Sequence, residues 1–352
     1  MRCLHLLVPG LFWPDTANPH PYAGLRLPCL ETLLGKGDRT PGRGGVETWL
    51  ATTHGFEAGT APLAAVARWG SAPPVTAESW MCADPVHLEP RGAEVFLTAG
   101  EVLDITADEA GACVAALNDF FREDDLAFEA LRPDRWVLRG PAARMRLTTT
   151  PLSETHGRGI DPLLPGGDDA RPWLRRLNEA QMLLHAHEVN TAREARGQPA
   201  INSVWFSWAG PHAAPKATPF TDVFSTDPLA AGIARAAGAT VHAEPEQLQP
   251  ALAAATRGQT LLHLGSIGRS AARADLGQWQ AALAWLDAEV LPDALLSLRN
   301  GIIDTLALTG FAGRTGMTIT LRRRHLLRFW RRPLALGTAL GSAAAPAASA
   351  RR

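Results

Sequence analysis

The chain has 352 residues, of which 46% are hydrophobic and 20% are charged, and its formal net charge is −1. At about 150 residues per domain this length predicts about two domains, and the composition excludes a disordered or fibrous chain. The nearly neutral net charge gives no overall reason to expect nucleic acid or an anionic membrane as a partner.

The N-terminal part predicts the beginning of an α/β domain. Residues 3–8 form an apolar run that ends at Pro9-Gly10, which predicts a buried strand followed by a turn. Residues 27–37 place leucines on one helical face and stop at a glycine, and a second short helix is expected at 61–69. We assign residues 1–83 to the first part of a core domain.

The pattern of expected helices and strands changes between residues 84 and 168. A strand is expected at 94–99, and Thr106 with Glu109 forms the capping box of a helix. Short strands follow at 126–131, 135–140 and 144–150. One helix with several short strands predicts a small α+β domain inserted into the core, with a Gly-, Pro- and Asp-rich exit linker.

From about residue 171 helices and strands alternate. We expect a helix at 172–193, a strand at 201–208, a helix from Asp227-Pro228 to Gly238, strands at 240–243 and 260–265, and a helix at 278–290. This alternation predicts a parallel sheet covered by helices, so residues 169–333 form the second part of the core. The low-complexity residues 334–352 are expected to be a disordered tail.

Cysteine usage and the N-terminus predict a cytoplasmic protein. The four cysteines stand far apart in apolar stretches and form no Cys-x-x-Cys pair, which excludes a zinc ribbon and a dithiol redox motif. The apolar run before Pro9 is too short to span a membrane and has no small-residue cleavage site.

The most distinctive stretch is 185–210. It places Asn190, Arg193 and Arg196 on the last turns of a helix and then leads into a strand. Ligand sites in parallel sheets lie beyond the carboxyl ends of the strands, so residues 207–210 are expected to open onto a site. Arginines near a helix C-terminus also stabilise the helix dipole, and this alternative stays open for Arg193 and Arg196.

This stretch resembles the archaeal type of cofactor-independent phosphoglycerate mutase, a branch of the alkaline phosphatase superfamily. The resemblance rests on Asn190-Thr-Ala-Arg193-Glu-Ala-Arg196-Gly197, followed by Asn202-Ser-Val-Trp205, and on segments 27–37, 153–165 and 224–239. The segments ADPVHL, NSVWF and FWRRP resemble more closely a bacterial group of RpfE-type putative regulatory proteins. The likeness extends to about residue 333.

The resemblance implies a three-layer α/β/α alkaline-phosphatase-like core that carries two divalent metals and a transiently phosphorylated serine. Such a metal pair needs Asp and His ligands. The first strand should end in a metal-binding Asp-Gly, but this chain has Val8-Pro9-Gly10. The serine position corresponds to Val46 in Gly45-Val46-Glu47, a later strand reads His263-Leu-Gly-Ser-Ile-Gly268, and no Asp-His dipeptide occurs.

A relocated metal site is the alternative. The residues available for it are Asp15, His20, His54, Asp84, His87, His156, His185 and His187. Since a lone histidine is more often hydrogen-bonded than a ligand, we expect neither a metal nor another cofactor; Mn or Zn enters only under this alternative.

Asp84 and His87 stand where the related family places a substrate-binding Asp and Arg, so His87 would replace a phosphate-binding arginine. A hinge turn capped by Asp84 is the competing interpretation, and His156 has the same ambiguity. At the other end, residues 321–333 hold six arginines, a Phe and a Trp. They are expected to be a solvated, Arg-rich strand edge, with a surface for nucleic acid or an acidic partner as the alternative.

The sequence therefore predicts a degenerate, non-catalytic phosphoglycerate mutase-like protein with a binding or regulatory role. The alternative is an active metal-dependent phosphomutase or phosphohydrolase with a rebuilt site. The expected partner is a small anionic ligand or a protein, with no membrane and no nucleic acid. The residues expected to line or support the ligand site are Asp84, His87, His156, Asn190, Arg193, Arg196, Asn202 and Trp205.

Overall fold

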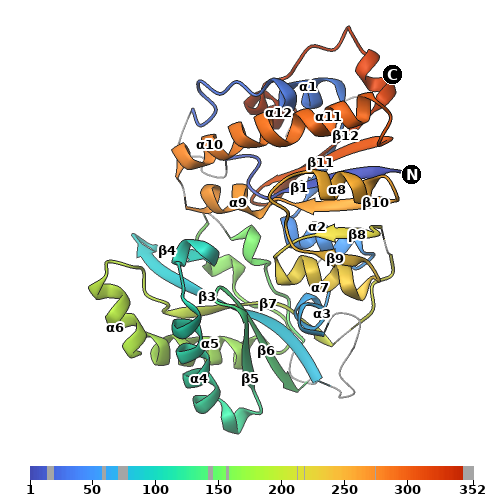
Figure 1. The fold of residues 1–352 in the computed structure, drawn as a ribbon. Helices are drawn as coiled ribbons and strands as arrows, with labels where there is room; N and C mark the ends of the chain where they lie inside the picture. The colour runs from blue at the N-terminus through green and yellow to red at the C-terminus, as the bar shows by residue number, and fades with distance from the viewer. Residues whose placement is uncertain are drawn as a thin grey trace, which may run out of the picture. The chain divides into compact units, whose positions relative to one another are not determined.

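The structure is a computed structural model that describes residues 1–13, 20–57, 61–69, 78–141, 146–155, 158–211, 213–217, 219–273 and 275–343. It divides into two compact units, shown in Figure 1. Unit 1 comprises 1–46, 219–226 and 239–352, and unit 2 comprises 47–218 and 227–238. No helix among the described residues is long and apolar enough to cross a membrane.

Unit 1 is built on a seven-stranded sheet in the order β2-β12-β11-β1-β10-β8-β9. Its strands are β1 (Cys3–Val8), β2 (Asp38–Arg43), β8 (Asp222–Phe224), β9 (Thr240–His242), β10 (Gln259–His263), β11 (Thr305–Ala312) and β12 (Thr315–Arg322). The five strands from β11 to β9 are parallel to one another. Strand β12 pairs antiparallel with β11 on one side and with β2 on the other. This confirms the predicted α/β class and its parallel sheet.

Helices cover one face of this sheet, and α1, α10 and α11 lie along it in Figure 1. The helices of unit 1 are α1 (Pro28–Lys36), α8 (Gln249–Ala255), α9 (Gly265–Ala272), α10 (Leu276–Trp285), α11 (Leu291–Arg299) and α12 (Leu336–Ala343). Leu4, Leu6 and Val8 of β1 belong to their common core, and Leu7, which points to the opposite face, is also fully buried. Because both faces of β1 are buried, residues 3–8 form a nearly continuous apolar run in the sequence.

Unit 2 is built on an antiparallel sheet of five strands. These are β3 (Glu78–Arg91), β4 (Glu94–Ala99), β5 (Ala127–Arg132), β6 (Arg135–Pro141) and β7 (Ser203–Pro211). The long strand β3 pairs with β7 along one edge, and with β6 and then β4 along the other. The helices of unit 2 are α2 (Val46–Thr53, of which Val46 belongs to unit 1), α3 (Leu63–Trp69), α4 (Ala107–Phe120), α5 (Ala170–His185), α6 (Glu188–Ala195) and α7 (Pro228–Ala236).

The two faces of this sheet differ. Met81 and Ala83 share a hydrophobic core with α4 and α5. Because side chains alternate along a strand, Cys82 and Asp84 point to the opposite face. The α4 capping box forms as predicted, with Thr106 accepting from the backbone of Glu109.

Four sequence expectations are wrong in detail. Segment 201–208 lies in the antiparallel sheet of unit 2, not in the parallel sheet, because β7 pairs with β3. The helix expected at 172–193 is broken into α5 and α6, since the His187 side chain caps a new helix. Among residues 144–150, those described form one isolated bridge at Thr148 instead of a strand. Residues 336–343 of the expected tail are helical.

Candidate functional site

The carboxyl ends of the parallel strands in unit 1 are the first place to look for a site, because ligands of open α/β sheets bind there. At the end of β1, Gly10 has a φ of +72°, and a Cβ atom on it would lie 2.8 Å from the Ala271 Cβ of α9. A Cβ atom on Gly268 would likewise lie 2.9 Å from the Pro9 Cβ. Helix α9 therefore packs directly on the turn after β1.

Apolar side chains fill the neighbouring positions. Leu11 is fully buried and packs on Gly310 of β11 so closely that no side chain would fit there. The indole nitrogen of Trp279 donates to the Gly10 carbonyl oxygen at 2.7 Å, and Trp13 packs against its ring. Pro9, at the position where the resemblance expects a carboxylate, and Gly10 are partly exposed, and they lie beside the buried Leu11 and Trp279.

The ends of β8 and β10 hold polar side chains instead. The hydroxyl oxygen of Ser225, directly after β8, lies 3.0 Å from Nδ1 of His263, the last residue of β10. Both residues are buried. On the outer strand, Nε2 of His242 lies 2.9 Å from the Asp222 carboxylate, and its ring stacks on Phe224.

These donors do not fit a two-metal centre. In unit 1 the ends of β1 and β10 offer backbone, apolar side chains and one imidazole, where two divalent ions need several carboxylate and imidazole ligands. Across the described residues of the whole chain, no group of three or more His, Cys, Asp or Glu side chains is arranged to hold a metal.

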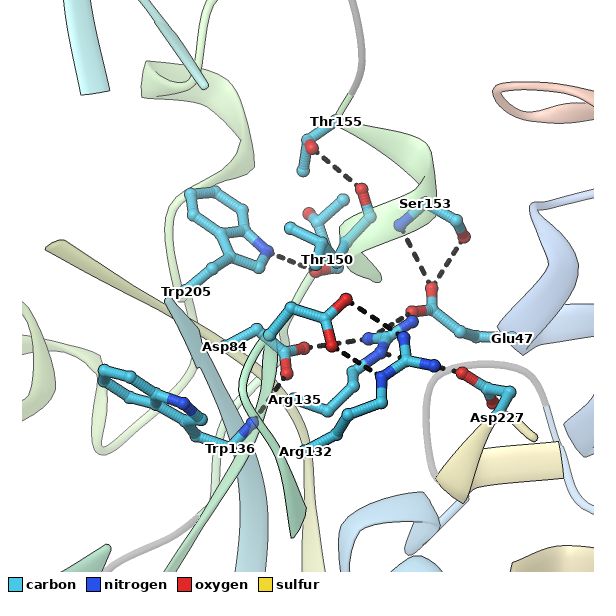
Figure 2. A network of polar contacts seen from close by, with 12 residues as sticks. Glu47, Asp84, Arg132, Arg135, Trp136, Thr150, Ser153, Thr155, Trp205 and Asp227 are labelled. Atoms are coloured by element: carbon cyan, nitrogen blue, oxygen red, sulfur yellow. Dashed lines mark hydrogen bonds and ion pairs between the residues drawn. The ribbon is translucent and has the colours of Figure 1, made fainter. Parts of the chain in front are cut away.

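Unit 2 contains a buried charge cluster, which we define as Glu47, Asp84, Arg132, Asp134 and Arg135. Figure 2 shows Glu47, Asp84, Arg132 and Arg135 directed toward one another. The register that pairs Cys82 with Val137 brings Arg135 opposite Asp84, and their charged groups lie 3.0 Å apart. The Asp84 carboxylate also accepts from the backbone nitrogen of Trp136 at 3.2 Å.

Arg135 contacts a second carboxylate, that of Glu47 at the start of α2, at 3.3 Å. A third, that of Asp227 at the N-cap of α7, lies 3.8 Å away. Beside Arg135, Arg132 donates two hydrogen bonds to the Asp134 carboxylate, at 2.6 and 3.0 Å. One guanidinium thus holds together α2, the sheet and the start of α7.

Burial and neighbouring charge act together on Asp84. Its pKa is raised from 3.8 to about 7, mainly because burial penalises the charged carboxylate. Arg135 opposes this rise, while Glu47 and Asp134 add to it. The pKa of the Arg135 guanidinium is raised well above its ordinary value, because the surrounding carboxylates outweigh its own desolvation.

Glu47 stands beside the position at which the resemblance expects a serine nucleophile. Its carboxylate accepts from the Ser153 hydroxyl at 2.6 Å and from the Ser153 backbone nitrogen at 3.1 Å. In return, the Thr48 hydroxyl donates to Glu154 at 2.9 Å. Figure 2 shows Ser153 directed at Glu47. The start of α2 is therefore pinned to the turn at Leu152–Glu154.

The structure places the predicted site residues in different roles. Asp84 lies in the charge cluster. Asn202 holds β3 through its amide, which accepts from the Leu88 nitrogen at 2.7 Å and donates to the Leu88 oxygen at 2.9 Å. The His87 Nδ1 donates to the Ala200 oxygen at 2.9 Å. The Trp205 indole donates to the Thr150 oxygen at 2.9 Å. His156 lies outside the described residues, as does Asp15 of the relocated-site alternative.

Three further predicted residues brace the end of α6. Asn190 is buried and bonds both the nitrogen and the oxygen of Ile201. Arg193 is fully buried and donates to Glu109 and to the carbonyls of Pro199 and Leu103. Arg196 pairs with the other oxygen of Glu109. Their ligand-binding role remains a prediction, but these hydrogen bonds go to the protein itself.

The expectation that residues 207–210 open onto a ligand site is not met. Ser207 and Trp208 are buried, and β7 runs antiparallel, so this strand end is not the ligand edge of a parallel sheet. A shift of register between β3 and β7 occurs here, and Trp208 has a φ of +55°. The backbone nitrogen of Trp208 donates to the Thr149 hydroxyl at 3.1 Å.

Sequence reasoning missed Arg135, Arg132 and Ser225 as site residues. Arg135 carries one usable signal: it is a charged residue directly before three apolar residues of a strand. Ser225 and His263 meet only because β8 and β10 are neighbours, although 38 residues separate them. Elsewhere in unit 2, a cavity of about 480 Å³ is lined by Asn118, Arg122, Arg139 and their neighbours, away from the charge cluster.

Comparison with known proteins points to phosphoglycerate mutases. No family model matches the chain. Over 75 residues it is 33% identical to the 2,3-bisphosphoglycerate-independent phosphoglycerate mutase of Methanosarcina barkeri. This match covers 21% of the chain and 18% of the relative, so it spans under a fifth of that protein's length.

Two solved structures are similar over most of the chain. The cofactor-independent phosphoglycerate mutase from Thermoplasma acidophilum matches with a TM-score of 0.44 and 15% identity, covering 91% of this chain and 89% of that one. The PH0037 protein from Pyrococcus horikoshii matches with a TM-score of 0.49 and 14% identity, covering 91% and 87%.

Proposed function

We propose that this chain is a degenerate, non-catalytic phosphoglycerate mutase-like protein with a binding or regulatory role. We propose that it belongs with the bacterial RpfE-type putative regulatory proteins that its ADPVHL, NSVWF and FWRRP segments resemble. The observation that carries the proposal is the packing of α9 on the end of β1, through Gly10 against Ala271 and Pro9 against Gly268.

This packing supports the proposal because metal-dependent phosphoryl transfer needs anionic ligands at fixed positions. The carboxylate of the Asp-Gly that the resemblance expects falls at Pro9, and a Cβ atom on Gly268 of α9 would lie 2.9 Å from the Pro9 Cβ, so α9 packs closely on this position. Leu11 and Trp279 are buried around the same turn. A metal ligand in place of Pro9 would therefore have to fit against the closely packed α9.

The charge cluster of unit 2 supports the same conclusion. An arginine that grips a phosphate must offer its guanidinium to the ligand. Arg135 already contacts Glu47 and Asp84, and both carboxylates are 1% exposed. A phosphate at Arg135 would have to expel a buried carboxylate, so this arginine serves the protein's own structure. A small anionic ligand or a protein partner is accordingly proposed to bind elsewhere, in the cytoplasm.

The test is a paired measurement of metal binding and turnover. The full chain is incubated with Mn²⁺, and bound Mn²⁺ is measured by electron paramagnetic resonance. Conversion of 3-phosphoglycerate to 2-phosphoglycerate is followed by phosphorus NMR, with the Methanosarcina barkeri mutase as the positive control. We expect no tightly held Mn²⁺ and no conversion above the protein-free background. Stoichiometric Mn²⁺ with turnover would overturn the proposal.

A second candidate, an active phosphohydrolase with a rebuilt site, is favoured by one observation. The Ser225 hydroxyl lies 3.0 Å from the His263 imidazole, the distance expected between a nucleophile and its general base. Hydrolysis of p-nitrophenyl phosphate that persists in the purified chain and is lost in both Ser225→Ala and His263→Ala would support this candidate. Activity that survives both substitutions would come from a contaminant and would remove it.

A further inference from the structure

The segment Leu327–Arg332 of unit 1 exposes three large apolar side chains within four residues. Leu327 is 75% exposed, Phe329 is 87% exposed and Trp330 is 67% exposed. The other large apolar side chains that are exposed stand singly, such as Met182 and Trp285. Large apolar side chains gathered at one surface position mark an interaction surface.

The segment is held in place by the side chains of two of its arginines, while its large apolar side chains stay exposed. Arg328 donates to the Lys36 oxygen at 2.8 Å and to the Asp38 carboxylate at 2.7 Å. Lys36 returns a bond to the Leu326 oxygen at 2.9 Å, and Arg331 donates to the Gly37 oxygen at 3.2 Å. The segment is therefore ordered in advance, so that binding through its side chains does not have to order the backbone.

Cationic side chains surround the apolar ones. Arg323, Arg324, Arg331 and Arg332 are exposed. Within the described part of the chain, Arg323, Arg324 and Arg332 form no ion pair, and Arg331 has only the distant Asp38, 4.0 Å away. The net charge of the whole chain, −1, does not reveal this local excess of positive charge.

The arrangement of the rings disfavours single-stranded nucleic acid as the occupant. Phe329 and Trp330 pack edge to face, with ring centroids 5.1 Å apart and an interplanar angle of 85°. Nucleic-acid platforms present separate ring faces on which successive bases stack. Here the edge of one ring covers a face of the other, and an aliphatic leucine completes the set.

We propose that Leu327, Phe329 and Trp330 insert into the interface of a lipid bilayer that carries anionic headgroups, which pair with Arg323, Arg324 and Arg332. Tryptophan and phenylalanine partition into the headgroup region, and basic side chains beside them are attracted to anionic lipids. The contact is peripheral and independent of any spanning helix. It departs from the sequence expectation of no membrane partner, which rested on the summed charge of the chain and on a single N-terminal run.

Vesicle binding tests this proposal. The full chain is sedimented with vesicles of phosphatidylcholine alone or of equal parts phosphatidylcholine and phosphatidylglycerol, at about 0.1 M and about 1 M salt, where the Debye length falls from about 10 to about 3 Å. We expect binding to the anionic vesicles at low salt and little binding to the neutral ones. Phe329→Ala/Trp330→Ala should lower the partition coefficient by about tenfold or more. Arg323→Gln/Arg324→Gln should lower it by about thirtyfold.

Matched variants in unit 2 are the controls. Phe120 is 51% exposed and packs edge to face on Phe121, and Arg171 and Arg235 are exposed arginines. Phe120→Ala and Arg171→Gln/Arg235→Gln should bind vesicles as the parent does. Trp330→Phe should keep binding and lose the component of tryptophan fluorescence that brominated lipids quench.

Three outcomes would overturn the proposal. One is no binding to anionic vesicles at low salt. Another is equal binding by the segment variants and the unit 2 controls. The third is a dependence on Phe329 and Trp330 that appears instead in self-association by sedimentation velocity or in binding of single-stranded DNA, which would assign the surface to another macromolecule.

Discussion

The two units treat charge in opposite ways. At the end of β1 in unit 1, where phosphoglycerate mutases need a carboxylate, the chain has Pro9 and Gly10 packed against a helix. On the sheet of unit 2, where a strand face usually packs apolar side chains, the buried Asp84 and the buried Glu47 of α2 contact the partly buried Arg135. The charged side chains of the cluster thus connect the elements of unit 2, whereas close packing of α9 closes the end of β1 in unit 1.

The largest effect is expected from breaking the charge cluster. Arg135→Met leaves Glu47 and Asp84 buried without their cation, which should lower the free energy of unfolding by about 3–5 kcal/mol. Arg175→Met is the control, because Arg175 is 82% exposed and forms only a surface pair with Glu179. It should cost less than about 0.5 kcal/mol. Urea denaturation measures both.

The triple variant Arg135→Met/Glu47→Gln/Asp84→Asn sharpens this test. It removes all three charges, so much of the stability lost in Arg135→Met should return, since neutral side chains can replace a buried ion cluster at small cost. Equal losses in Arg135→Met and Arg175→Met would show that the cluster does not hold unit 2 together.

The next effect concerns the closed strand end of unit 1. Gly10 and Gly24 have nearly the same φ, +72° and +75°, but only Gly10 has atoms within 4 Å of the position of a Cβ. Gly24→Ala should cost only the left-handed backbone strain of about 1–2 kcal/mol. Gly10→Ala adds overpacking against Ala271, for about 2–4 kcal/mol in all. Thermal melting of the two variants separates the cost of backbone strain from the cost of overpacking. Equal losses of stability in Gly10→Ala and Gly24→Ala would mean that α9 moves away easily.

A smaller effect is expected from pH. The folded Asp84 holds its proton up to about pH 7, whereas the unfolded carboxyl loses it near 3.8. The folded state therefore binds more protons between these values, and the free energy of unfolding should fall as pH rises from about 4 to about 7, by up to about 3 kcal/mol. Denaturation of the parent and of Asp84→Asn at several pH values measures the difference in slope.

Asp304→Asn provides the opposite control. Its hydrogen bond from Arg2 lowers the pKa of the Asp304 carboxyl, so the stability that it contributes is present above the unfolded pKa and is lost as pH falls through the folded pKa. Asp304→Asn should thus change the profile only in the acidic range. Parallel pH profiles for the parent and Asp84→Asn would contradict the buried, protonated carboxyl.

Local signals predicted local structure well. The apolar run 3–8 became β1, and the capping residues Thr106 and Asp227 begin α4 and α7 as expected. The sheet to which residues 201–208 belong could not be predicted. A strand buried on both faces has the same apolar pattern in a parallel and in an antiparallel sheet. The pairing of β7 with β3 depends on residues more than 100 positions away.

The candidate site was harder to predict for a related reason. Asn190, Arg193 and Asn202 look like ligand-binding residues because their side chains are polar and lie near expected strand ends. Their partners are backbone atoms of Ile201, Leu103 and Leu88. Such partners leave no trace in the sequence, since every residue offers the same carbonyl and amide. A polar side chain with a structural role and one with a ligand therefore look alike until the fold is known.

Asn202 provides the smallest and most specific test of that distinction. Its amide bonds both backbone groups of Leu88, so Asn202→Ala should lower the free energy of unfolding by about 1–2 kcal/mol through two lost hydrogen bonds. Gln198→Ala removes an exposed partner of Arg196 and should change stability by less than about 0.5 kcal/mol. If Asn202→Ala left urea denaturation unchanged, the Leu88 bonds would be dispensable, and the amide would be free to serve a ligand. A loss of the expected size instead ties Asn202 to the pairing of β3 and β7, in which Asp84 lies opposite Trp205.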